Sequence, residues 1–354
     1  MKDGENIKVG ISIGDINGIG CEIILKTFMD QRMLDFCTPV IYASTKTISL
    51  QRKHFNIKMD YVGVDNASKL LPGKINVVNL WKETPKIEYG KETKEGGKYA
   101  LQSIEAAVKA LKNKEIDVLV TAPINKHNIQ SDTFKFPGHT DYLAKELNGE
   151  ALMFMVTDTL KVGLLTDHVA VKDVSKHLTP ELIENKINAI HTSLKKDFRI
   201  IKPKIALLGI NPHSGDNRVI GTEDDELLKP VIKKINQEGK LVYGPYAADS
   251  FFGSENHKKF DAVLAAYHDQ GLIPFKTLSF GQGVNFTAGL EGVRTSPDHG
   301  TAFEIAGKNQ ADYSSFKEAL FTAISIYRNR DEYNKISSNP LKKLSAKQET
   351  KKRS

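Results

Sequence analysis

Short apolar segments alternate with longer helical patterns along most of the chain, and this alternation constrains the fold more than any other feature. Lys8–Ile13 and Asp117–Thr121 have the apolar, β-branched composition of buried strands. Between them, Gly97–Asn113 carries apolar residues at the three- and four-residue spacing of a helix. Strands that alternate with helices favour a largely parallel sheet with helices on its faces. The sequence therefore predicts an α/β fold.

The rest of the chain repeats this pattern. We expect further strands at Pro39–Ala43, Ile75–Leu80, Leu152–Val156, Val162–Leu165, Lys204–Ile210 and Asp261–Ala266, and helices at Thr179–Leu194, Glu223–Asn236 and Ser314–Tyr327. The two strands that begin at Leu152 and Val162 are close enough to form a hairpin. Thr179 directly precedes Pro180, which makes it a suitable N-terminal cap for its helix.

Polar residues follow many of these strands at the point where each strand ends. These polar clusters are Asp15–Gly18, Asn125–His127, Asp167–His168, Asn211–His213 and His268–Gln270. In open parallel sheets, ligands bind beyond the carboxyl ends of the strands. We therefore expect the clusters to meet at one edge of the sheet and to form a single active-site cleft.

Three of the ten histidines, His168, His213 and His268, each come directly after an apolar strand. Each has a carboxylate or an amide within two residues, which could fix the tautomer of the imidazole. Neutral imidazole binds zinc and similar divalent ions, and three protein ligands leave positions open for a substrate. No local motif links the three, so a metal site is one interpretation of their positions. His139 and His299 lie in glycine-containing loops and could also face a ligand.

The segment Gly14–Gly20 follows the first strand and opens a helix, and it has two interpretations. Its glycines could let backbone N–H groups approach an anion at the helix N-terminus. They could equally serve only a tight turn between strand and helix. The glycine spacing is not that of the dinucleotide-binding fingerprint, and no acidic residue ends a second strand about 20 residues later. A Rossmann dinucleotide site is therefore not supported.

Two further groups of residues favour an anionic ligand. Gly138–Asp141 precedes a helical pattern and offers hydrogen-bond donors to a phosphate or a carboxylate. Lys276, Asn285 and Arg294 lie in a stretch rich in glycine and polar residues. Each could be an ordinary surface residue by itself, but two cations and an amide together suit a doubly charged ligand.

The net charge of +7 does not indicate a nucleic-acid partner, because most of it lies in the last 20 residues. Residues 335–354 hold seven basic residues and one acidic residue, so the remaining chain is close to neutral. We expect this basic tail to be disordered. There is no secretory signal pattern and no apolar run of membrane-spanning length, and only two cysteines are present. These features predict a cytoplasmic protein without a membrane partner.

Six ordered segments resemble the 4-hydroxythreonine-4-phosphate dehydrogenase family of vitamin B6 biosynthesis, from about Val9 to Tyr327. The segments are GDINGIG, TAPINK, GHTDYLA, NPHSGD, AAYHDQGLIPFK and GVNFTAGLEGVRTSPDHGTAFEIAG. The last one also resembles the cofactor-side motif of isopropylmalate and isocitrate dehydrogenases, which bind a dinucleotide without a Rossmann fold. The first segment departs from the family, which commonly reads GDPAGIGPE, because Ile16, Asn17 and Cys21 replace Pro, Ala and Pro.

The resemblance implies two α/β/α domains of the isocitrate and isopropylmalate dehydrogenase type, with the active site in the cleft between them. We expect residues 1–137 and 300–334 in the first domain and residues 138–299 in the second. A homodimer would complete the site. A divalent metal, zinc or possibly magnesium or cobalt, would bind His168, His213 and His268, with one of the three from the partner chain. The implied contacts of the phosphorylated substrate are His139, Thr140, Lys276, Asn285 and Arg294.

The implied reaction is oxidation of 4-phosphooxy-L-threonine at its 3-hydroxyl by NAD or NADP, followed by loss of carbon dioxide to give 3-amino-2-oxopropyl phosphate. The general base is not determined, and Asp249 and Lys276 are the candidates. One alternative is a dehydrogenase of a related four-carbon phosphorylated acid, such as a threonate or erythronate phosphate. Another, from a different class, is a phosphate acyltransferase.

Overall fold

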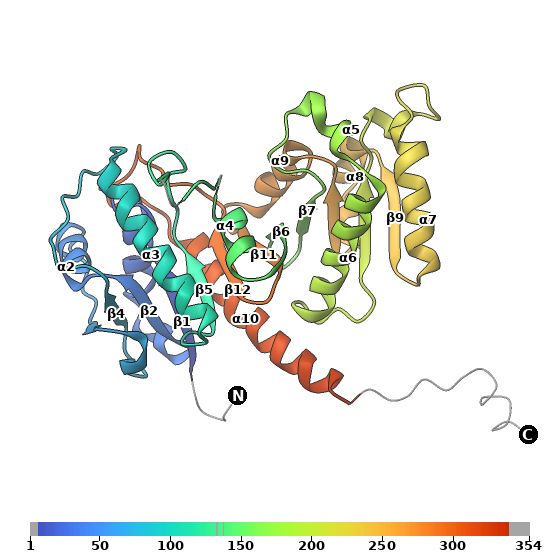
Figure 1. Ribbon diagram of the computed structural model, residues 1–354. Helices are drawn as coiled ribbons and strands as arrows, with labels where there is room; N and C mark the ends of the chain where they lie inside the picture. The colour runs from blue at the N-terminus through green and yellow to red at the C-terminus, as the bar shows by residue number, and fades with distance from the viewer. Residues whose placement is uncertain (1–5, 132–133, 137, 340–354) are drawn as a thin grey trace, which may run out of the picture.

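A single continuous sheet runs through the whole molecule. The computed structural model describes residues 6–131, 134–136 and 138–339, except for the side chains of residues 139, 141 and 150. Among these residues, twelve strands pair in the order β3-β4-β2-β1-β5-β12-β11-β6-β7-β10-β8-β9 (Figure 1). Their bounds are β1 (Ile7–Ser12), β2 (Cys37–Ala43), β3 (Val62–Val64), β4 (Asn76–Asn79), β5 (Val118–Thr121), β6 (Gly149–Val156), β7 (Lys161–Leu164), β8 (Lys204–Leu208), β9 (Leu241–Tyr246), β10 (Ala262–Ala265), β11 (Val284–Leu290) and β12 (Val293–Pro297).

The sheet consists of two parallel blocks that run in opposite directions. Strands β3, β4, β2, β1, β5 and β12 are parallel to one another, as are β7, β10, β8 and β9. Between the blocks, β11 and β6 form antiparallel pairs with each other and with their outer neighbours. The carboxyl ends of the two blocks therefore point to opposite edges. Our expectation that all polar clusters share one edge was wrong, because the central strands of the largely parallel sheet are antiparallel. The expected single cleft is confirmed for three of the five clusters, since Lys126, His168 and His268 line one cavity.

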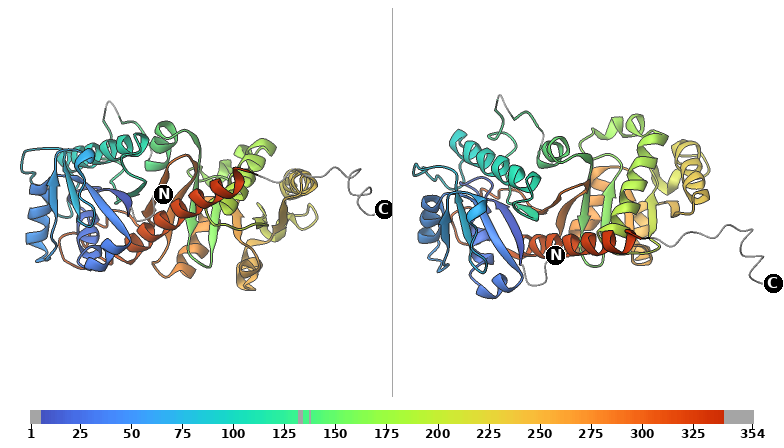
Figure 2. Two further views of the ribbon diagram at one scale, coloured as in Figure 1. Left: turned by 90° about the horizontal axis from the view of Figure 1, so that it is seen from below. Right: turned by 60° about the horizontal axis from the view of Figure 1, so that its bottom comes forward.

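Helices cover both faces of the sheet. Their bounds are α1 (Gly20–Thr27), α2 (Thr45–His54), α3 (Lys94–Lys112), α4 (His139–Glu146), α5 (Val174–His177), α6 (Pro180–Lys196), α7 (Lys229–Gln237), α8 (Ala248–Gly253), α9 (His268–Ser279) and α10 (Ser314–Ser337). Helices α3 and α4 share one apolar cluster, and α9 packs on the same side against β7 and β10. Helices α1, α6 and α10 bury their apolar residues in the larger cluster on the other side. Figure 2 shows α10 running along the underside of the sheet from one half to the other.

Helix α3 illustrates how the sequence sets these elements. Thr93 caps its N-terminus, because the hydroxyl accepts a hydrogen bond of 3.0 Å from the N–H of Gly96. Ala100, Ile104 and Ala107 are fully buried and recur at the spacing that places them on one face of the helix. The predicted cap of α6 is confirmed in the same way, because Thr179 accepts from the N–H of Leu182.

Most predicted elements are present, and the predicted hairpin is confirmed by the antiparallel pairing of β6 and β7. The last helix is longer than expected and continues to Ser337. Residues 335–337, which we assigned to a disordered tail, are therefore helical, and residues 340–354 lie outside the described part. Strands β3, β9, β11 and β12 were not predicted. In the described part of the chain, no helix has the length and apolar character needed to cross a membrane.

Candidate active site

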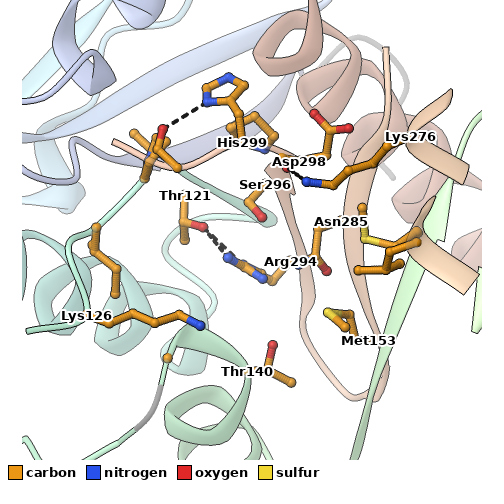
Figure 3. Close-up of a pocket in the computed structure, with 18 of the residues that line it drawn as sticks. Thr121, Lys126, Thr140, Met153, Lys276, Asn285, Arg294, Ser296, Asp298 and His299 are labelled. Carbon is orange, nitrogen blue, oxygen red and sulfur yellow. Dashed lines mark hydrogen bonds between the residues drawn. The ribbon is translucent and has the colours of Figure 1, made fainter. Parts of the chain in front are cut away.

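A cavity of about 270 Å³ lies over the central strands, between the N-terminus of α4 and helix α9. Figure 3 shows side chains from both halves of the sheet converging on it. Its lining includes Thr121, Lys126, Thr140, Met153, Met155, His168, His268, Lys276, Asn285, Arg294, Ser296, Asp298 and His299. The cavity is therefore lined by residues that follow β5 in one block of parallel strands and by residues that follow β7 and β10 in the other block.

Arg294, on β12, is the most deeply buried charged group in the cavity, with 1% of its surface exposed. Its Nε and Nη2 atoms both donate hydrogen bonds to the hydroxyl of Thr121, at 3.1 and 2.6 Å. Its Nη1 atom donates to the hydroxyl of Thr287 at 3.1 Å. These bonds fix the plane of the guanidinium at the floor of the cavity.

The charge of Arg294 has no carboxylate partner among the described residues. Burial away from water lowers the pKa of Arg294 to about 9, because desolvation disfavours the charged form. A buried charge is normally paired, since an unpaired one is costly. The two threonine hydroxyls that bind the guanidinium are neutral, so they do not compensate its positive charge. The charge and the remaining N–H donors are available to a ligand. The cavity therefore favours an anion next to Arg294.

Asn285 and Lys276 line the same cavity. The Oδ1 atom of Asn285 is buried and has no hydrogen-bond partner in the protein. Buried polar atoms are rarely left unpaired, so this amide is available to a ligand. The Nζ atom of Lys276 donates one hydrogen bond of 3.2 Å to the carbonyl oxygen of Asp298, which leaves two of its three N–H donors.

His168 and His268 both line the cavity, and their ring centres are 6.3 Å apart. His268 is the first residue of α9, and its Nδ1 donates to the carboxylate of Asp269 at 2.7 Å. This hydrogen bond leaves Nε2 with a free lone pair, as a metal ligand requires. The backbone N–H of His168 is bonded to the carboxylate of Asp167.

Two of the residues singled out from the sequence do not line this cavity. His213 is exposed and has a left-handed backbone conformation, with φ of 54°, in the turn that follows β8. Asp249 is exposed on the short helix α8. Within the described part of the chain, no cluster of three or more metal-binding side chains is present. One chain alone thus brings His168 and His268 together without His213.

The fold and the cavity can now be set beside known proteins. A family model described as "Pyridoxal phosphate biosynthetic protein PdxA" matches residues 35–323, which is most of the chain. The chain belongs to the PdxA family. This finding confirms the resemblance that the six sequence segments indicated.

Relatives in the PdxA family match along nearly the whole chain. A 4-hydroxythreonine-4-phosphate dehydrogenase from Bacteroides thetaiotaomicron is 47% identical over 339 residues, which is 95% of this chain and 93% of the relative. A D-threonate 4-phosphate dehydrogenase from Cupriavidus necator is 35% identical, covering 88% of this chain and 95% of the relative. A crystal structure of a 4-hydroxythreonine-4-phosphate dehydrogenase from Burkholderia phymatum is 33% identical, with a TM-score of 0.75 over 91% of this chain and 99% of the other.

The loop Gly14–Gly20 departs from the common PdxA sequence, and the structure favours its interpretation as a tight turn. The N–H groups of Asp15 and Ile19 donate to the carbonyls of Pro123 and Thr301. Gly14 has a φ of 67°, and a Cβ atom there would lie 2.1 Å from the carbonyl oxygen of Pro123. Only glycine fits this position, and packing within the protein is sufficient to explain it.

Sequence reasoning missed several residues of the cavity. Thr121 ends β5 and could have been noticed as one more polar residue at a strand end. Thr287 gives no such signal, because it lies inside β11, a strand that was not predicted. Lys126 was noticed only as part of a polar cluster and was given no role. Thr140 lines the cavity as expected, and His139 begins α4, but its side chain lies outside the described part.

Proposed function

We propose that this chain is a metal-dependent 4-hydroxythreonine-4-phosphate dehydrogenase that uses NAD or NADP. The observation that carries the proposal is the buried guanidinium of Arg294, which has no carboxylate partner among the described residues and lines one cavity with His168 and His268. A small phosphorylated hydroxy acid supplies both an anion for the arginine and a hydroxyl for a metal site. The relatives named as such dehydrogenases support the same activity.

The substrate, 4-phosphooxy-L-threonine, would be held by His139, Thr140, Lys276, Asn285 and Arg294. Arg294 gives a rigid, charged contact, because its plane is already fixed by Thr121 and Thr287. Lys276 contributes a second cation from α9, and the amide of Asn285 is buried and free to pair. A ligand with two anionic groups fits this distribution of donors.

The metal would be zinc, or magnesium or cobalt, bound by His168, His213 and His268. When bound, it acts as a Lewis acid that lowers the pKa of the substrate 3-hydroxyl. The ring centres of His168 and His268 are 6.3 Å apart, so both imidazoles could contribute to one metal site. The position of His213 away from the cavity agrees with a site that two copies share in a homodimer.

The reaction begins with removal of the proton from the 3-hydroxyl. Lys276 lines the cavity, whereas Asp249, like His213, lies outside it in one chain and would reach it only from a partner copy. Lys276 could act as the base only in its neutral form, so both residues stay candidates. A bound NAD or NADP would supply the acceptor for the hydride from C3. His299 and Gly300 lie in the segment that resembles a cofactor-side motif, and both line the cavity. The product has a carboxylate β to a ketone and loses carbon dioxide, since the carbonyl accepts the electrons of the broken bond.

The experiment that tests the activity is a substrate panel with metal-reconstituted protein and both cofactors. We expect 4-phosphooxy-L-threonine to give the highest kcat/KM for nicotinamide reduction. A higher value for D-threonate 4-phosphate would favour the second candidate, which the relative from Cupriavidus necator supports. Acetyl-phosphate formation without nicotinamide reduction would favour the acyltransferase. A cytoplasmic location and the domain boundaries at residues 137 and 300 remain predictions from the sequence.

A further inference from the structure

Lys126 is a cation of the cavity to which no function has been assigned. It lies five residues after the end of β5, in the half of the sheet opposite to Lys276. Figure 3 shows its side chain extending along the cavity, with the amine toward Arg294 and Thr140. Among the described residues, no carboxylate pairs with this amine.

The backbone and the stem of Lys126 are both held in place. The side chain of Gln130 donates hydrogen bonds to the carbonyls of Lys126 and Phe136, at 3.0 and 2.8 Å. A Cβ atom placed on Gly138 would lie 3.7 Å from Cε of Lys126, so the end of the lysine lies against the start of α4. This arrangement brings the ammonium close to the N-terminus of a helix.

Three positive features therefore converge on one end of the cavity. They are the ammonium of Lys126, the buried guanidinium of Arg294 and the N-terminus of α4, whose first N–H groups favour anions. On the other side of the cavity, Lys276 is the only described lysine or arginine that lines it, beside His168 and His268 of the proposed metal site. The one lining carboxylate, Asp298, already accepts a hydrogen bond from Ser315.

The unequal distribution of charge distinguishes the two anions of the substrate. A phosphate monoester carries nearly two negative charges at neutral pH, whereas a carboxylate carries one. The proposed metal would hold the 3-hydroxyl, so the end with Lys126, Arg294 and the N-terminus of α4 suits the phosphate, and Lys276 suits the carboxylate. We propose that Lys126 binds the phosphate of the substrate, together with Arg294, Thr140 and the N-terminus of α4, and so selects phosphorylated over unphosphorylated substrates.

This inference rests on the proposed function, and its test compares two substrates that differ only in the phosphate. The variants are Lys126→Met, Lys126→Arg and, as a matched control, Lys135→Met. Lys135 is an exposed lysine after the same strand that does not line the cavity. For 4-phosphooxy-L-threonine, we expect Lys126→Met to lower kcat/KM by about 10- to 100-fold, mainly through KM. For unphosphorylated 4-hydroxy-L-threonine, it should change kcat/KM by less than about threefold.

Lys126→Arg should recover most of the lost kcat/KM, and Lys135→Met should behave as wild type. Equal losses on both substrates would overturn the proposal, because Lys126 would then act on a shared part of the molecule. An unchanged kcat/KM of Lys126→Met on both substrates would also overturn the proposal.

Calorimetry with inorganic phosphate separates this proposal from the proposed function, because it does not depend on turnover. We expect Lys126→Met to weaken phosphate binding by about tenfold, even if the wild-type protein oxidises neither substrate. Unchanged phosphate affinity would contradict the phosphate contact. Failure of the wild-type protein to oxidise any substrate of the panel would contradict only the proposed activity.

Discussion

The guanidinium of Arg294 donates two hydrogen bonds to the single hydroxyl of Thr121, at 3.1 and 2.6 Å. The two residues are 173 positions apart in the chain but lie on neighbouring parallel strands, β12 and β5. Thr121 thus belongs to the half of the sheet that carries Lys126, and Arg294 lies next to the central strands. This contact orients the arginine that we propose to bind the substrate.

Thr121→Val should remove that orientation while keeping the shape of the side chain. We expect KM for 4-phosphooxy-L-threonine to rise about tenfold with a smaller change in kcat, because the arginine loses the acceptor of two of its hydrogen bonds. Thr295→Val is the matched control. The hydroxyl of Thr295 donates to the carbonyl of Ala319 in α10, on the opposite face of β12. A similar KM for the two variants would contradict the role of Thr121.

Asn17 replaces the alanine that is common in the PdxA family, and its side chain joins the first loop to the segment before α3. Its Nδ2 donates to the carbonyl of Lys91 and the hydroxyl of Thr93, and its Oδ1 accepts from the N–H of Glu88. Asn17→Ala should lower the free energy of unfolding by about 3 kcal/mol, since three partly buried hydrogen bonds are lost. Urea denaturation measures this, with the exposed turn variant Asn66→Ala expected to cost under about 1 kcal/mol.

Asp197 and Arg330 form a buried ion pair between the ends of α6 and α10, with 2.6 Å between Oδ1 and Nε. The exposed pair Arg199–Glu332 joins the same two regions and provides a comparison. Arg330→Met should cost about 3–5 kcal/mol, because it leaves a carboxylate buried without its partner. Arg199→Met should cost under about 1 kcal/mol, since water screens an exposed pair. Equal effects in chemical denaturation would show that burial does not decide the energy of these pairs.

Much of the fold could be predicted from the sequence, because helix and strand patterns are local. The alternation of β1, α3 and β5, the cap at Thr179 and the β6–β7 hairpin are all of this kind. The reversal of direction between the two parallel blocks could not be predicted, because it depends on β11 and β12. These strands carry Asn285, Thr287 and Arg294 toward the cavity, so they lack a continuous apolar run, although β11 does alternate apolar and polar residues.

The residues of the site also divide into those that local sequence indicates and those that depend on long-range contacts. Positions directly after apolar strands identified His168 and His268, and the structure brings both to the cavity. Asn285 and Arg294 were singled out in a polar, glycine-rich stretch, the family resemblance gave them the substrate as ligand, and both also line the cavity. The partners of Arg294 could not be found in this way, since Thr121 and Thr287 meet it only through long-range strand pairing. Nothing in the local sequence of His213 indicates that it lies outside the cavity.

A metal site shared by two copies can be tested by mixing inactive variants. His168→Ala, His213→Ala and His268→Ala should each lower turnover by orders of magnitude with the fold intact. Unfolding and refolding the variants together in pairs produces mixed dimers. A pair whose mutated ligands come from different chains regenerates one intact site per mixed dimer, or about a quarter of wild-type activity. We expect two of the three pairs to recover. No recovery in any pair would contradict a shared site.

The most direct test of the central claim is the simultaneous measurement of reduced nicotinamide and carbon dioxide formed from 4-phosphooxy-L-threonine by metal-reconstituted protein. We expect equal amounts of the two products with NAD or NADP, and loss of both when a chelator removes the metal. No nicotinamide reduction with either cofactor, or the same rate in the presence of chelator, would contradict a metal-dependent dehydrogenase that acts on this substrate.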